Sequence, residues 1–525
     1  MRARIVAAVV AVAVVAGGAY AVTRFVAPAH DDALTLVPKH SVLYANVFLS
    51  PSTSQKRALE DLLSKFEAVK NPEEAEDKLT RLIDYLLGDS SLTYEDDLEP
   101  WLGPQAAFFV GDFDQLVPEA AALIATTDED ATRAMMDKLD EDAGEEPEEE
   151  EYESVPYDLY PEEQLASGFV EDFWVVGSES GFKAVVDTTQ AEESLADVGR
   201  FDSVTSRLTD DPIAMFYADV SALFEAFGRA AGAAGMTTED RAAFEAMGFD
   251  HFGPVAAALS LRKDGVLFES ASRVPEEGPL SAFVNPGAGL LSKLPAESWV
   301  ALGVGDLGAY VERFLDLAVD LAPPGTDPMF FEDQFTVETG LDLRRDLLSW
   351  IGDAGVFVQG TGFLDLGGGL VLEATDAAAA AGALDKLAAL ATREGAPVRP
   401  DEVGGAAGYA IQEVGMPEPV YAVARGDRVV VAYGQKATGD ALSGGATLSE
   451  SDAFERASQM LGDGFAASFY LDAATAVTLA ENMGAKRDDT YRRDVAPWVE
   501  PLAHVIAGSR LDGDVMLQRF MIGVE

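Results

Sequence analysis

A tryptophan motif that occurs twice constrains the architecture of this chain more than any other feature. Trp101 is followed by Leu-Gly and by an apolar run that ends at Val110. Trp350 is followed by Ile-Gly and by a second apolar run that ends at Val358. The tryptophans lie 249 positions apart, which is close to half of the 525 residues. Each copy predicts a tight turn that leads into a buried strand.

Other residue pairs repeat in the same order along the two halves of the chain. Their offsets stay between 248 and 257 positions, so only small changes of length separate the copies. Such ordered matches indicate a tandem duplication of a unit of about 240 residues. A repeat this long is not a solenoid, because each copy can bury its own core. The matching positions are Val37-Pro38 with Leu294-Pro295, Thr127 with Thr375, Lys138 with Lys386, Asp172 with Asp427, Phe201 with Phe454, Phe216-Tyr217 with Phe469-Tyr470, and Asp264-Gly265 with Asp512-Gly513.

The pattern of elements indicates an α+β fold in each copy. Short apolar strands close as hairpins, and amphipathic helices occur in pairs. We therefore expect two related domains, each a mainly antiparallel sheet with flanking helices. The domains cover residues 34–274 and 288–525, and the Pro/Gly-bearing residues 275–287 form a linker between them.

Local signals place several helix starts. Ser52 with Gln55 has the spacing of a capping box, and Thr127 is a candidate N-cap for a helix that ends near Leu139. Further helices are expected at residues 79–87 and 238–247, where apolar residues recur with helical spacing.

The N-terminus predicts a membrane segment over residues 1–26, followed by a tether over residues 27–33. Arg2 and Arg4 precede an apolar run from Ile5 to Val22, which at 1.5 Å per residue is about 27 Å long and just spans a bilayer core. We expect a single-pass signal anchor that leaves the bulk of the chain extracytoplasmic. The small residues around Tyr20 also fit a cleavage site, in which case the protein is secreted.

Charge and composition exclude several classes of function. The net charge of −54 leaves no basic surface for nucleic acid, and it disfavours lying flat on an anionic membrane. The absence of cysteine excludes disulfides, thiolate metal sites, a cysteine nucleophile and a lipid-modified cysteine. An acidic, solvated surface is the plain interpretation, and the gathering of cations is the alternative.

Residues 140–153 are almost wholly acidic. Counting from Asp140 puts Glu145 at the sixth position of a calcium loop, where a glycine is needed, so the EF-hand pattern fails. We expect a disordered, self-repelling loop, with weak and nonspecific cation binding as the alternative.

Residues 303–308 fit the pattern GxGxxG between a strand and a helix, as in dinucleotide-binding folds. The matching positions in the first copy include Asn46 and Phe48, so the fold does not need these glycines. We interpret the motif as a strand end with small residues, and we expect no cofactor. The four histidines form neither HExxH nor a shared pattern between the copies, so a His-based metal or triad site is not expected.

Asp219 and Asp472 occupy matching positions after a strand and before a helix. Paired acids in related domains could form a metal or acid/base site, and they are the candidate metal ligands of this chain. The favoured interpretation is that each carboxylate caps the next helix. Trp101 and Trp350 likewise could stack on a ligand, although an indole that fills a core is the favoured interpretation.

The stretch from Leu36-Val37-Pro38 to Val47 and the stretch from Asp97 to Val110 resemble an uncharacterised bacterial family. This domain-of-unknown-function family occurs in actinobacteria and cyanobacteria, usually behind an N-terminal membrane segment. The resemblance covers nearly everything after Ala33, and it implies location and architecture but no site residues.

These observations favour a non-enzymatic, membrane-tethered extracytoplasmic protein that binds a protein partner or an amphiphilic ligand. One alternative is a cell-envelope hydrolase or metal-dependent enzyme that uses carboxylates such as Asp219 and Asp472. Another is a purely structural envelope protein.

Overall fold

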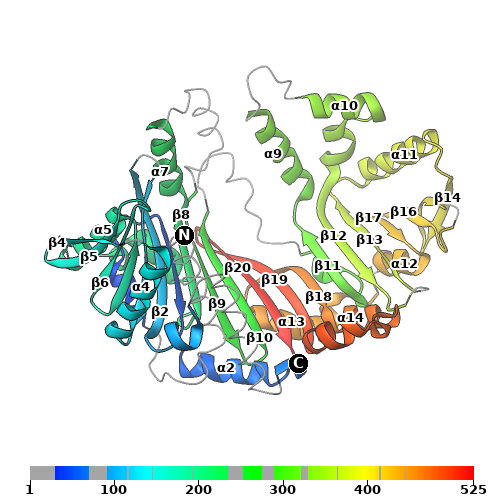
Figure 1. Cartoon of the computed structure of the whole chain (residues 1–525). Coiled ribbons are helices and arrows are strands. Elements are labelled where there is room, and N and C mark those ends of the chain that lie inside the picture. Colours follow the sequence, from blue (N-terminus) through cyan, green and yellow to red (C-terminus); the bar gives the residue numbers. More distant parts are fainter. Residues whose placement is uncertain are drawn as a thin grey trace. The chain divides into compact units, whose positions relative to one another are not determined.

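The computed structural model describes residues 30–69, 92–114, 117–144, 146–191, 193–233, 252–274, 289–320, 329–362, 365–412, 415–443 and 445–525. The chain divides into two compact units, Met1–Val274 and Pro275–Glu525. The division falls where the expected linker begins. Each unit is α+β, and every strand pairing within a unit is antiparallel (Figure 1).

In unit 1 the described strands hydrogen-bond in the order β4-β5-β6-β7-β3-β2-β1-β8-β9-β10. The strands are β1 (Leu43–Phe48), β2 (Leu102–Asp114), β3 (Val117–Thr126), β4 (Glu148–Tyr152), β5 (Val155–Tyr160), β6 (Leu165–Val170), β7 (Phe173–Gly177), β8 (Ala214–Asp219), β9 (Pro254–Arg262) and β10 (Gly265–Arg273). The helices are α2 (Thr53–Leu63), α4 (Glu129–Ala143), α5 (Glu179–Ala191), α6 (Gly199–Thr205) and α7 (Val220–Ala233).

In unit 2 the order is β14-β15-β16-β17-β13-β12-β11-β18-β19-β20, which has the same connectivity. The strands are β11 (Ser298–Val304), β12 (Ile351–Gln359), β13 (Gly367–Ala374), β14 (Val398–Val403), β15 (Ala406–Ile411), β16 (Val420–Arg425), β17 (Arg428–Tyr433), β18 (Ala466–Asp472), β19 (Leu502–Asp512) and β20 (Val515–Val524). The helices are α9 (Leu307–Asp320), α10 (Phe330–Thr339), α11 (Ala377–Arg393), α12 (Gln435–Ser443), α13 (Asp452–Leu461), α14 (Ala473–Asn482) and α15 (Ala496–Val499).

One face of each central sheet is covered by a short helix that carries a phenylalanine. In unit 1, Phe201 of α6 packs edge-on against Tyr217 with ring centroids 5.0 Å apart. In unit 2, Phe454 of α13 packs edge-on against Tyr470 at 5.2 Å. These tyrosines and their cross-strand neighbours are buried, namely Tyr44 and Ala256 in unit 1 and Ala301 and Ile506 in unit 2.

The opposite face is covered only in part, by α4 in unit 1 and by α11 in unit 2. Met135 and Leu139 of α4 pack on the strands around Trp101 and Trp174. Ala380, Ala383 and Leu384 of α11 pack on Trp350, Leu372 and Val429. Each of these helices therefore forms a core with the tryptophan turn that precedes it.

The predicted capping box at Ser52 is confirmed in part, because the Ser52 hydroxyl accepts a hydrogen bond from the Gln55 N–H at 3.1 Å. The prediction that Thr127 caps α4 is wrong by one residue. Asp128 is the N-cap, and its carboxylate accepts from the Ala131 N–H at 3.0 Å. Thr127 instead donates from its backbone N–H and its hydroxyl to the Trp101 carbonyl.

The prediction of a disordered loop over residues 140–153 is also wrong for most of that range. Helix α4 continues through Ala143 to a left-handed Gly144, and Glu148–Tyr152 form β4. All four glutamates of β4 are exposed, so solvent screens their repulsion while the backbone pairs with β5. Tyr152 holds the strand end, since its hydroxyl donates to Asp187.

Several predictions fall on residues that the structure does not describe. The membrane segment over residues 1–26, the first part of the tether at 27–29, the helices at 79–87 and 238–247, and the linker over 275–287 lie there. The rest of the predicted tether is packed into the fold, because Ala33 is buried at the start of a 3₁₀ helix and the Asp31 carboxylate accepts a hydrogen bond from the Tyr44 hydroxyl. Within the described part of the chain, no helix combines the length and apolar character needed to cross a membrane.

Candidate functional site

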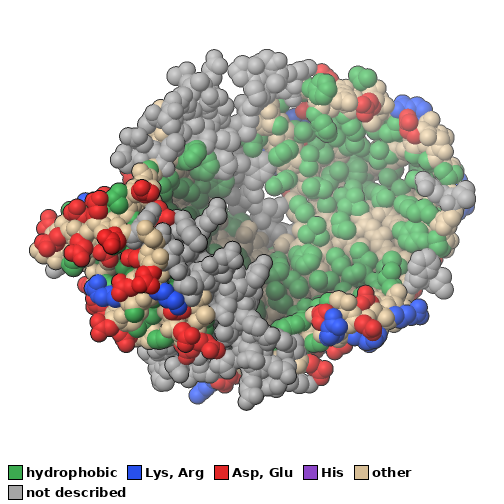
Figure 2. All heavy atoms as spheres, in the orientation of Figure 1, with side chains coloured by type: hydrophobic (Ala, Val, Ile, Leu, Met, Phe, Trp, Pro, Cys, Tyr) green, Lys and Arg blue, Asp and Glu red, His purple; other side chains and the backbone are tan. Residues whose placement is uncertain are grey.

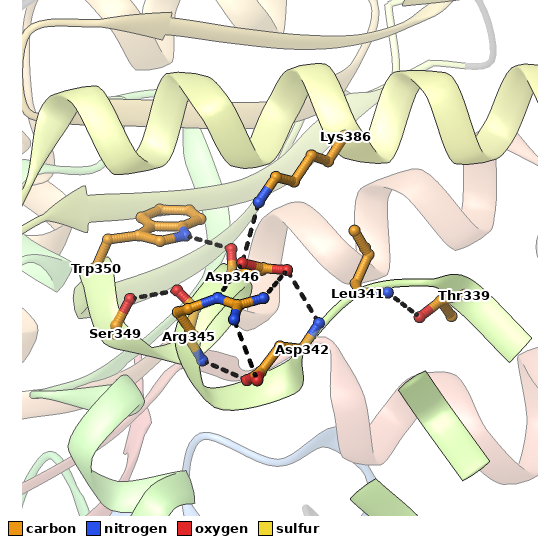
Figure 3. A network of polar contacts seen from close by, with 8 residues as sticks. All are labelled: Thr339, Leu341, Asp342, Arg345, Asp346, Ser349, Trp350 and Lys386. Carbon is orange, nitrogen blue, oxygen red and sulfur yellow. Dashed lines mark hydrogen bonds and ion pairs between the residues drawn. The ribbon is translucent and has the colours of Figure 1, made fainter. Parts of the chain in front are cut away.

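The tryptophan turns are built alike in the two units, and both indoles lie in a core. Trp101 is fully buried and donates from its indole nitrogen to the Asp97 carbonyl at 2.6 Å. Trp350 is buried and donates to the Asp346 carbonyl at 3.2 Å (Figure 3). The ring faces are thus taken up by packing, which leaves neither tryptophan open for stacking on a ligand.

In each unit the carboxylate of this aspartate, Asp97 or Asp346, also binds a lysine of the helix that follows in the chain. In unit 2, Asp346 Oδ1 accepts from the Arg345 guanidinium and from Lys386 of α11, each at 3.0 Å, while the Asp342 N–H donates to Oδ2 at 3.0 Å (Figure 3). The Arg345 guanidinium, with help from that N–H and Lys386, holds the pKa of Asp346 well below its usual range. Lys138 and Asp97 form the matching pair in unit 1 at 2.9 Å.

The two candidate metal ligands cap helices in their own units. Asp472 accepts from the Thr475 N–H at 3.0 Å and from its hydroxyl at 2.9 Å. Asp219 accepts from the Ala222 N–H at 3.2 Å and from Arg200 at 2.8 Å. Among the described residues, no group of three or more His, Cys, Asp or Glu is arranged to hold a metal ion.

Close packing explains at least one glycine of the GxGxxG stretch. A Cβ on Gly308 would lie 2.4 Å from the carbonyl oxygens of both Leu348 and Ile351. The start of α9 therefore approaches the Trp350 turn too closely for any side chain. This contact explains a glycine there without a bound nucleotide.

The histidines are separate from one another where they are described. His40 Nε2 lies 2.5 Å from Glu119 Oε1, and this hydrogen bond raises the pKa of the imidazole. His504 Nε2 lies 2.7 Å from the Met460 sulfur. His251 falls outside the described residues.

The feature that stands out is a bare apolar surface on the sheet of unit 2. Leu302 of β11 lies directly opposite Val356 of β12 and Phe469 of β18. Phe469 lies opposite Ala507, which in turn lies opposite Phe520. These residues form one row across five strands, and a second row runs parallel to it two residues along each strand: Val358, Val300, Leu471, Val505 and Ile522. We call these ten residues the apolar face.

Exposure separates the two sides of these strands sharply. Leu302, Val356 and Phe520 are 42%, 41% and 39% exposed. The residues next to them in sequence, Ala301, Phe357 and Met521, are at most 2% exposed because they point to the α13 side. Figure 2 shows hydrophobic side chains gathered over this part of unit 2.

Cover from α11 stops just short of the apolar face. Ala354, which lies opposite Val304, belongs to the core under α11, whereas Val356 is exposed. Burying the exposed part of a Leu, Val or Phe side chain is worth on the order of 1 kcal/mol. The three exposed residues can therefore contribute roughly 3 kcal/mol to the binding of an apolar group, and the seven half-buried residues beside them extend the contact.

Unit 1 has a corresponding face that is more polar. Its first row is Phe108, Ala45, Phe216, Ala257 and Ser270. Serine thus stands where unit 2 has Phe520, and alanine stands where unit 2 has Leu302. A strong apolar site is therefore a property of unit 2.

Sequence reasoning missed the apolar face, although a signal was present. The runs Val300-Ala301-Leu302, Val356-Phe357-Val358 and Phe469-Tyr470-Leu471 are apolar without alternation. An antiparallel strand with one solvated face normally alternates apolar and polar residues, so an unbroken run indicates that both faces are apolar.

Comparisons with known proteins identify a family but no activity. No curated protein matches the sequence. Two crystal forms of TP0453, forms I and III, resemble 48% of this chain over 81% and 82% of their own length, with a TM-score of 0.24 and sequence identities of 10% and 11%. The family model described as "Protein of unknown function (DUF3352)" matches residues 5–487. Bacterial origin and membrane anchoring stay predictions. The chain belongs to the DUF3352 family of proteins of unknown function.

Proposed function

We propose that this chain is a non-enzymatic binding protein whose unit 2 holds the acyl chain of an amphiphile. The observation that carries the proposal is the pair of apolar rows through Leu302 and Val300, which cross five strands without a polar side chain. Soluble proteins seldom leave an apolar surface of this extent uncovered, and such patches mark binding sites.

The backbone beneath the apolar face favours a hydrocarbon over an extended peptide. Strands β11, β12, β18 and β19 are each paired on both edges. Their N–H and C=O groups are therefore committed to the sheet. An extended peptide laid on this face would lose water from its own backbone without gaining hydrogen bonds, which costs about 1–3 kcal/mol per group. An acyl chain carries no such groups.

The length of the face also fits an acyl chain. Five adjacent strands span four gaps of about 4.8 Å, or about 19 Å in total. The hydrocarbon core of a bilayer is about 30 Å thick, so the chains of one leaflet extend about 15 Å. A lipid acyl chain can lie along one row from Val356 to Phe520.

We further infer that the two units descend from a tandem duplication and that the chain is tethered to a membrane. The identical strand order and the Asp97–Lys138 and Asp346–Lys386 pairs support the duplication. The apolar run from Ile5 to Val22 supports the tether. Asp219 and Asp472 are engaged in helix caps, and nothing in their surroundings favours the alternative of an envelope hydrolase.

Native mass spectrometry of the full chain, released from detergent in the gas phase, tests the binding proposal. We expect a bound acyl-bearing adduct on the wild-type protein. Leu302→Asp and Phe520→Asp should reduce the adduct about tenfold or more, since a carboxylate in an apolar contact costs at least ~1.4 kcal/mol.

Phe268→Asp is the matched control, because Phe268 is a comparably exposed phenylalanine on the β9–β10 hairpin of unit 1. The control should retain the adduct. An adduct that survives Leu302→Asp and Phe520→Asp, or the absence of any adduct on the wild-type protein, would contradict the proposal.

A further inference from the structure

Helix α10 displays apolar side chains although it buries none. No residue of Phe330–Thr339 is buried. Phe330 and Phe331 are each 63% exposed, and Val337 is 85% exposed. Helices of globular domains gain most of their stability from an apolar stripe that faces the core. In α10 the apolar residues face solvent, so something other than a core holds the helix in place.

The helix is held by charge. Arg344, in the turn that leads to Trp350, donates from Nε and Nη2 to the two oxygens of Glu332 at 2.8 and 2.9 Å. Its Nη1 donates to Asp316 of α9 at 2.6 Å. A bidentate arginine–carboxylate pair fixes orientation as well as distance. Arg344 therefore joins α9 to α10 and fixes the orientation of α10, so that the same side chains of α10 always face outward.

The two helices carry further exposed aromatic residues. Helix α9 follows β11 directly, and Phe314 on it is 57% exposed. Figure 2 shows hydrophobic side chains at α10 as well as over the strands of unit 2. Unit 2 therefore displays apolar side chains on α9 and α10 in addition to the apolar face.

We propose that α10 inserts Phe330 and Phe331 into the headgroup region of a lipid bilayer, so that an acyl chain passes between the bilayer and the apolar face. This inference rests on the proposed function. Aromatic side chains favour that interface, where an apolar body meets water. The predicted membrane segment over residues 1–26 supports the same occupant, because it would keep the chain at a bilayer.

The negative charge of α10 determines which lipid headgroups the helix prefers. Arg344 neutralises Glu332, but Asp333 and Glu338 remain exposed on the helix. An anionic surface would repel these two carboxylates. We therefore expect α10 to prefer zwitterionic phosphatidylcholine over anionic phosphatidylglycerol.

The cysteine-free sequence allows a direct test with the full chain in phosphatidylcholine vesicles. The variant Val337→Cys carries a polarity-sensitive dye on α10, and Glu450→Cys carries it at an exposed polar site on the α13 side of the sheet as the matched control. The dye at position 337 should show a blue-shifted emission and quenching by a headgroup-labelled quencher lipid. The dye at position 450 should show neither. Adding Phe330→Ser and Phe331→Ser should abolish the quenching at position 337.

Equal emission at positions 337 and 450 would overturn the inference. A blue shift without lipid quenching, rising with protein concentration, would assign α10 to a second copy of the chain and would also overturn it. Quenching that survives loss of both phenylalanines would do the same. The proposed function fails separately, through native mass spectrometry without an adduct, and lipid quenching at position 337 would then still stand.

Discussion

The Lys386 ammonium lies 3.0 Å from Asp346 Oδ1, and this ion pair ties α11 to the turn that positions Trp350. Asp346 is nearly buried, with 8% of its side chain exposed. Lys138 and Asp97 make the same link between α4 and the Trp101 turn at 2.9 Å. One short polar contact thus fixes the helix that covers part of the sheet in each unit.

Replacing Asp346 by Asn should lower the melting temperature, because the turn loses its charged link to Arg345 and Lys386. The pKa of Asp346 is held below its ordinary value of 3.8, so this stabilisation is present above that pH and is lost as the pH falls through the lower pKa of the folded state. Differential scanning calorimetry should show a gap between wild type and Asp346→Asn that is constant near neutral pH and narrows in acid. A gap that widens in acid would contradict this assignment.

Asp31 should show the opposite pH dependence. Its carboxylate accepts from the Tyr44 hydroxyl at 2.6 Å and from the Asn46 amide at 2.7 Å, and burial raises its pKa above 3.8. A raised pKa gives stability that is full below the ordinary value and is lost as the pH rises through the folded-state value. The wild type should therefore lose stability relative to Asp31→Asn as the pH rises above about 4. Equal slopes for the two proteins would show that the carboxyl is not buried.

Gly308→Ala should destabilise unit 2 by about 1–3 kcal/mol, because the new Cβ meets two carbonyl oxygens at 2.4 Å. Gly382, inside α11, has nothing within 4 Å of an added Cβ and is the matched control. Gly382→Ala should stabilise by about 0.5–1 kcal/mol through helix propensity. Urea denaturation measures both. An unchanged free energy of unfolding in Gly308→Ala would contradict the close contact of α9 with the Trp350 turn.

Asp472→Ala should cost about 1 kcal/mol, since it removes the cap that accepts from Thr475. The expected melting temperatures of wild type and variant do not respond to millimolar calcium, magnesium or zinc. Stabilisation of the wild type by one of these ions, lost in Asp472→Ala, would restore the metal hypothesis.

Much of the fold could be predicted from the sequence because its strands and caps carry local signals. The strands around Tyr44, Val110 and Tyr217, and the burial of Trp101 and Trp350, follow from short apolar runs next to turn residues. These signals depend on neighbours in the chain and not on distant packing.

The errors arose where distant partners decided the structure. Thr127 and Asp128 are adjacent, and either residue type can cap a helix. The Thr127 hydroxyl donates to the Trp101 carbonyl, 26 positions away, which leaves Asp128 as the cap. Strand β4 forms despite its four glutamates because β5 supplies a full ladder of backbone pairs. The apolar face was missed because an apolar run gives no information about which of its two sides is covered.

Photocrosslinking with a diazirine-bearing fatty acid tests the central claim most directly. The full chain in phosphatidylcholine vesicles is irradiated and digested, and the labelled peptides are identified by mass spectrometry. We expect label on the peptides of β11, β12 and β18, beside any label on the N-terminal apolar run, and we expect the label on these strands to be lost in Leu302→Asp but not in Phe268→Asp. Label spread equally over the sheets of both units, or unchanged by Leu302→Asp, would contradict it.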